Sequence, residues 1–289
     1  MHEKITYLVT NYNNSKYVAE CLSSIVNQSN NNWECLVVDD CSTDNSVQII
    51  RDYVSSKLKL IENSHNYGQI ESLQKLFDLV KTDIVGIIDS DDAIHPDTTK
   101  YVLNAFRVSP RIGLVYTNCI EYKENLKTPI SIGQAEKIPF GPSSSIIFGR
   151  VPSMRAFRLS CYNKTEGYDV KLKYAEDLDL VYKLEEVCLP YYVNKCLYKY
   201  RYVPNSRSRK QTTELEMIEN HRRAKFNALR RRRVNSGMKY LYYAIIYSEY
   251  YSKKSKCLNH KVRKKLSQTL YNKLKSLAHA LTFKTLKIH

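Results

Sequence analysis

The sequence predicts an α/β protein with an open, mostly parallel sheet covered by helices on both faces, followed by a basic helical extension. Between residues 5 and 122, short apolar runs of strand length alternate with segments whose apolar residues recur at helical spacing. This alternation is typical of parallel sheets, whose strands are joined through crossover helices. The 289 residues suffice for one large domain and an appendage.

Five strands and four helices are expected in this part of the chain. Runs rich in Val, Ile and Leu predict strands at 5–13, 33–40, 58–63, 83–92 and 112–122. The segments between them predict helices at 15–28, 45–54, 70–81 and 96–108. One face of the first helix is formed by Val18, Cys21, Leu22, Ile25 and Val26.

The remainder of the chain divides near residue 206. Residues 128–160 contain several prolines and glycines and predict a loop-rich segment. After residue 206 the pattern turns helical and strongly basic. Residues 207–289 hold 22 Lys and Arg against 4 Asp and Glu, whereas residues 1–206 hold 23 against 25. We therefore predict a domain at 1–206 and a basic helical extension at 207–289.

This extension admits three interpretations. Four consecutive arginines at 230–233 are compatible with a nucleic-acid-binding module, although no zinc, helix-turn-helix or RNA-binding signature accompanies them. A leucine stripe in the helix expected at 260–282, near the tyrosine-rich residues 240–251, favours binding to an anionic membrane surface. The same stripe could instead dock on the domain or on a second copy of the chain.

The sequence predicts a cytoplasmic protein, peripheral at the inner face of the plasma membrane. No signal-like segment opens it, and the apolar run YLYYAIIY is shorter than the roughly 20 residues of a membrane span. The eight cysteines lack the C-x-x-C spacing of metal sites, which favours reduced thiols.

Aspartates follow two of the expected strands. Asp39 and Asp40 end the run CLVVDD, and Asp89, Asp91 and Asp92 end the run IIDSDD. Ligands of open α/β sheets bind beyond the carboxyl ends of the strands, so both groups should face one crevice. An Asp-x-Asp pair suits a divalent cation whose other ligands are diphosphate oxygens and water. The alternative for 89–92 is an acidic loop that caps the following helix.

Four blocks in order carry a family resemblance. The first block is residues 9–46, which begin VTNYNNSK and end VVDDCSTDNS; the others are ENSHNYGQ (62–69), DIVGIIDSDD (83–92) and YAEDLDLVYKL (174–184). Over residues 4–206 the chain resembles the family 2 glycosyltransferases, the inverting enzymes that use nucleotide-diphospho-sugars. The resemblance implies the GT-A fold, a Rossmann-like open sheet.

The resemblance also implies how a nucleotide is held. Thr10, Tyr12, Asp39 and Asp40 match the family's nucleotide-binding positions. Asp40 is expected to accept an N–H of the base, because a carboxylate can only accept. Asp39 is expected to brace the loop or the ribose.

The remaining acids match the family's metal and catalytic positions. Asp91 and Asp92 are expected to contact the ribose and a Mn²⁺ or Mg²⁺ ion, with Asp89 orienting them. Asp177 matches the general base that takes the proton of the acceptor hydroxyl, with Glu176 as its orienting or structural partner. An acidic first turn that favours the positive end of a helix dipole is the alternative for 176–179.

Two positions depart from the family pattern. Leu73-Gln74 stand where many members have Arg-Asn, and Val203 stands where many have a histidine near the metal. Contacts to the diphosphate would then have to come from elsewhere. The candidates are Arg201, Arg207 and Arg209.

The implied activity is transfer of a sugar from a UDP-sugar or a similar donor to a hydroxyl of a glycan or lipid-linked acceptor. The expected setting is the synthesis of a surface polysaccharide or glycolipid, with no nucleic acid as partner and homo-oligomerisation left open. The alternatives are a basic nucleic-acid-binding module and a degenerate transferase fold that binds without turnover. All the acids that the reaction needs are present, which argues against the degenerate fold.

Overall fold

The computed structural model describes residues 3–138, 144–147, 151–204, 206, 214–232, 242–248 and 250. The chain forms two compact units. The first contains residues 1–135, 151–166 and 187–203, and the second contains residues 136–150, 167–186 and the chain from 204 onwards. The domain boundary expected at residue 206 stays a prediction.

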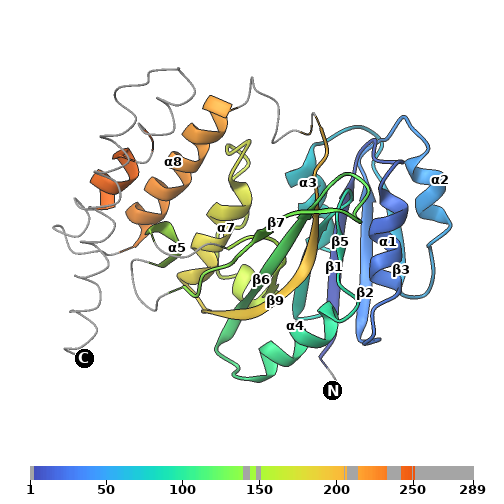
Figure 1. Cartoon of the computed structure of the whole chain (residues 1–289), viewed down its shortest axis with the longest axis horizontal. Coiled ribbons are helices and arrows are strands. Elements are labelled where there is room, and N and C mark those ends of the chain that lie inside the picture. Colours follow the sequence, from blue (N-terminus) through green and yellow to red (C-terminus); the bar gives the residue numbers. More distant parts are fainter. Residues whose placement is uncertain are drawn as a thin grey trace. The chain divides into compact units, whose positions relative to one another are not determined.

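The first unit is built on a nine-stranded sheet in the order β3-β2-β1-β4-β8-β6-β9-β5, with β7 paired to β6 (Figure 1). The strands are β1 (Ile5–Asn11), β2 (Trp33–Asp39), β3 (Leu58–Glu62), β4 (Ile84–Asp89), β5 (Ala93–Ile94), β6 (Ile112–Tyr122), β7 (Pro129–Gly133), β8 (Arg155–Arg158) and β9 (Leu189–Arg201). Its helices are α1 (Val18–Val26), α2 (Ser46–Arg51), α3 (Gln69–Phe77), α4 (Thr98–Arg107) and α6 (Leu159–Tyr162).

The sheet is parallel in one half and mixed in the other. β1 pairs in parallel with β2 and β4, and β2 pairs in parallel with β3, as expected. Beyond β4 the short strand β8 runs antiparallel to both β4 and β6, and β6 pairs in parallel with β9. Within the segment expected to be loop-rich, 128–160, the structure has two short strands that the sequence did not predict, β7 and β8. Both are short, and β7 lies at an edge, so neither carries the long apolar run of a central strand.

Helices cover both faces of the sheet, because side chains of a strand point alternately to either face. Ile5, Tyr7 and Val9 of β1 belong to one buried cluster, which also contains apolar residues of α1, α2 and α4. Leu8 is equally buried but lies outside that cluster, and α3 packs on β1 and β2. The predicted two-sided arrangement is confirmed.

The second unit contains α5 (Ser144–Ile147), α7 (Glu176–Glu185), α8 (Glu214–Arg231) and the helical residues 242–248. Its own buried cluster joins Tyr182 of α7, Ala228 of α8 and Ile245. No helix of the described residues is both long enough and apolar enough to cross a membrane. The helix expected at 260–282 lies outside the described residues.

Candidate active site at the carboxyl ends of the parallel strands

The parallel register brings the predicted nucleotide-binding residues of the first unit to one edge of the sheet. Asn11 at the end of β1 pairs with Asp39 at the end of β2, and Thr10 pairs with Asp89 at the end of β4. The side chain of Asn14, just past β1, donates to Ser90 Oγ at 2.8 Å. Three strand ends and the acidic loop after β4 are therefore held together as one constellation.

Asp39 braces the loop that follows β2. It is 1% exposed. Its Oδ2 accepts from Asn11 Nδ2 and from Ser42 Oγ, both at 2.7 Å, and its Oδ1 accepts from the backbone N–H of Ser42 at 2.8 Å. Of the two roles expected for Asp39, these contacts are those of a loop brace.

Asp40 holds a second loop, which leads into α3. Its Oδ1 accepts from Asn63 Nδ2 at 2.8 Å and from the Tyr67 N–H at 2.9 Å, and its Oδ2 accepts from the Gly68 N–H at 2.7 Å. Burial alone would raise the pKa of Asp40, but the hydrogen bonds outweigh it and lower that pKa. Gly68 has φ +87°, a left-handed conformation that favours glycine. A base N–H would be a fourth donor to this carboxylate, which has about four acceptor positions.

Among the acids after β4, Asp92 is less well satisfied than Asp39 and Asp40. Asp92 is 1% exposed; its Oδ1 accepts from the Arg201 N–H at 2.7 Å, whereas its buried Oδ2 has no hydrogen-bond partner among the described residues. Burial, and then the charges of Asp91 and Asp89, raise the pKa of Asp92 well above its usual range. Burial also raises the pKa of Asp91. A buried, underbonded carboxylate of this kind is expected where a cation binds.

Sequence reasoning missed the supports of this acid cluster. Gln69, the first residue of α3, donates to Asp89 Oδ1 at 3.3 Å, and the hydroxyl of Tyr198 accepts from the Asp89 N–H at 3.2 Å. The guanidinium of Arg201 donates hydrogen bonds to the backbone carbonyls of Asp91 and Glu124. It also donates to the Glu20 carboxylate at 2.7 Å. The guanidinium expected to contact the diphosphate is thus engaged inside the protein. Arg207 and Arg209 lie outside the described residues.

Tyr12 is 48% exposed, whereas Asn11 directly before it is buried. It follows directly after β1, and Thr10 is half-buried in that strand. An exposed aromatic ring at this edge can stack on a nucleotide base, which is worth about 1–3 kcal/mol in other base-binding proteins.

The second unit holds Glu176 and Asp177 in the first turn of α7. Both side chains are half-buried, and Asp177 Oδ1 accepts from the Leu178 N–H at 2.7 Å. Asp179 is 1% exposed, and its carboxylate pairs with Lys183 at 2.7 Å and Arg231 at 3.5 Å. Asp179 is therefore the structural acid of the EDLD turn, and the roles of Glu176 and Asp177 stay predictions.

A model of glycosyl transferase family 2 matches residues 6–164, more than half of the chain. The chain belongs to glycosyl transferase family 2. Chondroitin synthase of Escherichia coli is 27% identical over 199 residues, which are 67% of this chain and 28% of that protein. The chain thus spans about a quarter of the length of this relative.

Two solved structures share the fold of this family 2 chain. S. aureus TarS 1–349 in complex with UDP-GlcNAc has a TM-score of 0.71 at 19% identity, covering 94% of this chain and 79% of that one. The mannosyltransferase PcManGT from Pyrobaculum calidifontis, in complex with GDP-Man and Mn²⁺, has a TM-score of 0.64 at 16% identity, covering 99% and 88%. The expected GT-A fold is confirmed.

The acid loop fits a divalent cation that keeps other ligands. Among the described residues, no three His, Cys, Asp or Glu side chains converge into a complete metal site. Mg²⁺ is commonly bound through one or two carboxylates together with substrate phosphates. The unpartnered Oδ2 of Asp92 beside Asp91 matches that incomplete donor set.

Proposed function

We propose that this family 2 chain is a metal-dependent, inverting glycosyltransferase. It takes a sugar from a nucleotide-diphospho-sugar, a UDP-sugar, and moves it to a hydroxyl of a glycan or lipid-linked acceptor. One observation carries the proposal most: the raised-pKa, underbonded Asp92 lies at the strand edge that also presents the exposed ring of Tyr12. Such an arrangement suits a base on one side and a cation with diphosphate on the other.

In this proposal the work is divided between the two groups of acids. Asp91 and Asp92 would hold Mn²⁺ or Mg²⁺, and the bound ion would stabilise negative charge on the leaving diphosphate. Asp177 takes the proton of the acceptor hydroxyl, and Glu176 orients Asp177. Tyr12 stacks on the base, while Asp39 and Asp40 keep the loops around it in place.

The donor can be identified by thermal shift with a panel of nucleotide sugars, each with Mn²⁺ or with chelator. A donor at 100 times its dissociation constant adds about 2.7 kcal/mol to stability. We expect a UDP-sugar to raise Tm with Mn²⁺ and much less with chelator, and we expect Asp91→Asn and Asp92→Asn to lose that gain. Asp52→Asn, a change at an exposed acid, is the control. Full donor turnover in chelator would exclude the metal role.

The base is tested by separating donor binding from transfer. Asp177→Asn should keep the donor-induced shift in Tm and lower the rate of transfer by about 10²–10⁴. If Asp177→Asn transfers at the wild-type rate and Glu176→Gln does not, the two roles are exchanged.

The proposed setting is polysaccharide or glycolipid synthesis at the inner face of the plasma membrane. Support comes from the likeness to a chondroitin synthase and from the basic extension. Tyr242, Ile245 and Ile246 are 0–1% exposed within the second unit, so a truncation should end after residue 250. That truncation should abolish binding to anionic vesicles at low salt while donor hydrolysis persists. A full-length protein that ignores such vesicles would exclude the membrane location.

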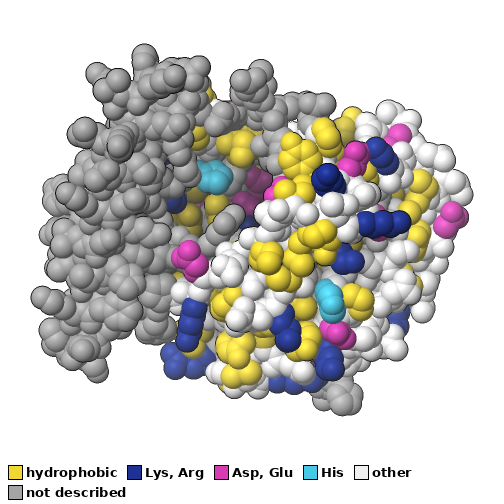
Figure 2. Space-filling model, viewed as in Figure 1, with side chains coloured by type: hydrophobic (Ala, Val, Ile, Leu, Met, Phe, Trp, Pro, Cys, Tyr) yellow, Lys and Arg dark blue, Asp and Glu magenta, His cyan; other side chains and the backbone are white. Residues whose placement is uncertain are grey.

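The nucleic-acid alternative finds less support. Two of the four consecutive arginines pair with acids at the end of α7: Arg232 with Glu185 at 3.0 Å, and Arg231 with Glu186, the residue directly after the helix, at 3.1 Å. Among the described residues on the face shown in Figure 2, Lys and Arg side chains lie beside hydrophobic and acidic ones.

A further inference from the structure

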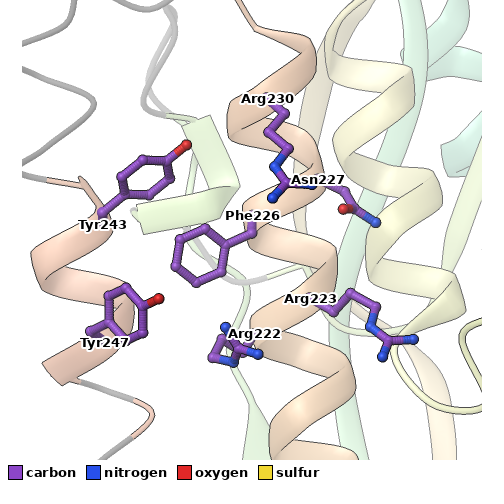
Figure 3. Close-up of a pocket in the computed structure, with 7 residues that line it drawn as sticks. All are labelled: Arg222, Arg223, Phe226, Asn227, Arg230, Tyr243 and Tyr247. Atoms are coloured by element: carbon purple, nitrogen blue, oxygen red, sulfur yellow. The ribbon is translucent and has the colours of Figure 1, made fainter.

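The second unit contains a groove of about 570 Å³ along α8. One wall is the aromatic side chain of Phe226, which points towards Tyr243 and Tyr247 on the neighbouring helical segment (Figure 3). Arg222 and Arg223 lie towards one end of the lining stretch of α8, and Asn227 and Arg230 lie towards the other. We call this cavity the α8 groove.

The arginines of α8 differ in whether their charge is already neutralised. Arg222 is ion-paired with Glu219, and its guanidinium lies 5.3 Å from the ring centroid of Phe226. By contrast, Arg223, Asn227 and Arg230 make no side-chain hydrogen bond or ion pair with any other residue in the described part of the chain. Arg223 and Arg230 are also exposed.

These three polar residues form one stripe of the helix. Positions 223, 227 and 230 are spaced i, i+4 and i+7, which places them on one face of α8. Arg223 and Arg230 are seven positions apart, which is about 10 Å along the helix axis. The groove thus offers two separated guanidinium groups with an amide between them, and guanidinium groups bind carboxylate or phosphate in a bidentate manner.

The aromatic wall adds a surface that a simple anion site does not need. Phe226 packs against Tyr243 with ring centroids 4.9 Å apart and edge-on against Tyr247 at 5.2 Å. Tyr247 remains 44% exposed, so its ring can contact a ligand. An amphipathic ring beside polar donors suits a ligand with alternating apolar and hydroxyl-bearing faces, such as a sugar ring.

The groove belongs to the same compact unit as the proposed base. α8 packs on α7, which carries Asp177, and ion pairs from Arg231 and Arg232 to α7 hold the two helices together. A ligand in the α8 groove is therefore held on the unit that supplies the acceptor-activating carboxylate. Such a ligand is better placed as an acceptor than as an unrelated anion.

We propose that the α8 groove binds a saccharide chain carrying carboxylate or phosphate groups, as the acceptor of the transfer. This inference rests on the proposed function. Arg223 and Arg230 bind successive acid groups of the chain, Asn227 binds a hydroxyl, and the ring of Tyr247 packs on a sugar. A neutral saccharide would leave both guanidinium groups without partners.

The test measures binding of labelled oligosaccharides to the full-length protein by fluorescence polarisation, without donor. The probes are an oligogalacturonate, an oligomer of poly(glycerol phosphate) and a neutral malto-oligosaccharide of the same length; the first two distinguish carboxylate from phosphate. We expect one anionic probe to bind, with an affinity that falls as salt rises, and the neutral probe not to bind. Arg223→Gln/Arg230→Gln should weaken binding about tenfold or more.

The matched control removes two exposed cations of the first unit, as Lys81→Gln/Lys100→Gln, and should leave binding within about twofold of wild type. Tyr247→Ala should weaken saccharide binding at unchanged net charge. The proposal is overturned if neither anionic probe binds or if the two double variants behave alike. It is also overturned if Arg223→Gln/Arg230→Gln loses binding only to single-stranded DNA or to anionic phospholipid vesicles. Binding of the nucleotide-sugar donor is measured separately, by thermal shift, and tests the proposed function itself. If no donor raises Tm while the anionic saccharide still binds, the transferase function is refuted and the saccharide site in the α8 groove stands.

Discussion

Asp40 could act by contacting the nucleotide base or by bracing a loop, and the two roles predict different outcomes for Asp40→Asn. If its carboxylate mainly accepts a base N–H, Asp40→Asn should weaken donor binding and leave the fold intact. The structure gives Asp40 another task, because both of its oxygens accept hydrogen bonds from the loop at 63–68. We therefore expect Asp40→Asn to destabilise the protein before any donor is added.

The size of the effect follows from the three donors. An asparagine keeps one acceptor oxygen and turns the other into an NH₂ group, which would face either the Gly68 N–H or the Tyr67 N–H together with Asn63. At least one charge-assisted hydrogen bond is lost, and such bonds contribute about 1.5–3 kcal/mol each. With a buried donor then left facing another donor, the free energy of unfolding should fall by about 2–4 kcal/mol.

The pH dependence gives a second check of the same reasoning. The pKa of Asp40 is lowered in the folded protein, so its stabilising contribution is present above the unfolded pKa of about 3.9 and is lost as pH falls through the folded value. The difference between wild type and Asp40→Asn should therefore be largest near pH 7 and shrink below about pH 4.

Urea denaturation followed by circular dichroism at several pH values measures both effects. Asp52→Asn is the control, since that exposed carboxylate makes no side-chain hydrogen bond with the described residues, and it should stay within about 0.5 kcal/mol of wild type. The bracing role is refuted if Asp40→Asn unfolds like wild type while its affinity for the donor nucleotide drops.

Three further substitutions test packing and exposure. Gly113→Ala should destabilise by about 1–3 kcal/mol in urea melts, because its Cβ would lie 2.3 Å from the Cβ of Cys188; Gly133→Ala should cost less, since its nearest contact is one sulfur at 2.4 Å that can rotate. The reverse ranking would contradict this packing. Tyr12→Ala should leave stability within about 0.5 kcal/mol and weaken UDP binding about tenfold by calorimetry, and unchanged UDP affinity would exclude stacking. Arg201→Lys should lower the free energy of unfolding by about 2–3 kcal/mol, because a single ammonium cannot reach three acceptors at once, and wild-type stability would show that those contacts contribute little.

The elements that the sequence predicted are those whose signal is local. Each of the first four parallel strands is a short apolar run, and each helix between them has a face of apolar residues, so pattern alone places them. β8 has only four residues, RAFR, and both its first and its last residue are arginine. Its position between β4 and β6 depends on strands that are distant in the chain. A four-residue run with charged ends carries no pattern from which that pairing could be predicted.

The positions of the acid groups could be predicted from the sequence, but the hydrogen bonding of their carboxylates could not. A strand that ends in paired aspartates is visible in the sequence, and so is its expected position at the ligand edge of the sheet. Which acids are satisfied depends on donors far away along the chain. Asp40 receives the N–H groups of residues 27 and 28 positions later, and Asp92 receives the Arg201 N–H from 109 positions later. Only folding brings these donors to the carboxylates.

The two groups of aspartates at this sheet edge differ in how well their carboxylates are hydrogen-bonded. Asp39 and Asp40 are buried, and both oxygens of each carboxylate accept hydrogen bonds from internal donors, which fix the loops around them. Asp92 is equally buried, but one of its oxygens has no hydrogen-bond partner in the part of the chain that the structure describes, and burial and its acidic neighbours raise its pKa. The incomplete hydrogen bonding of the buried Asp92 carboxylate lowers the free energy of unfolding, and a bound cation would remove that cost. In the function that we propose, a metal ion bound at Asp92 together with the donor's diphosphate would supply the partner that this carboxylate lacks.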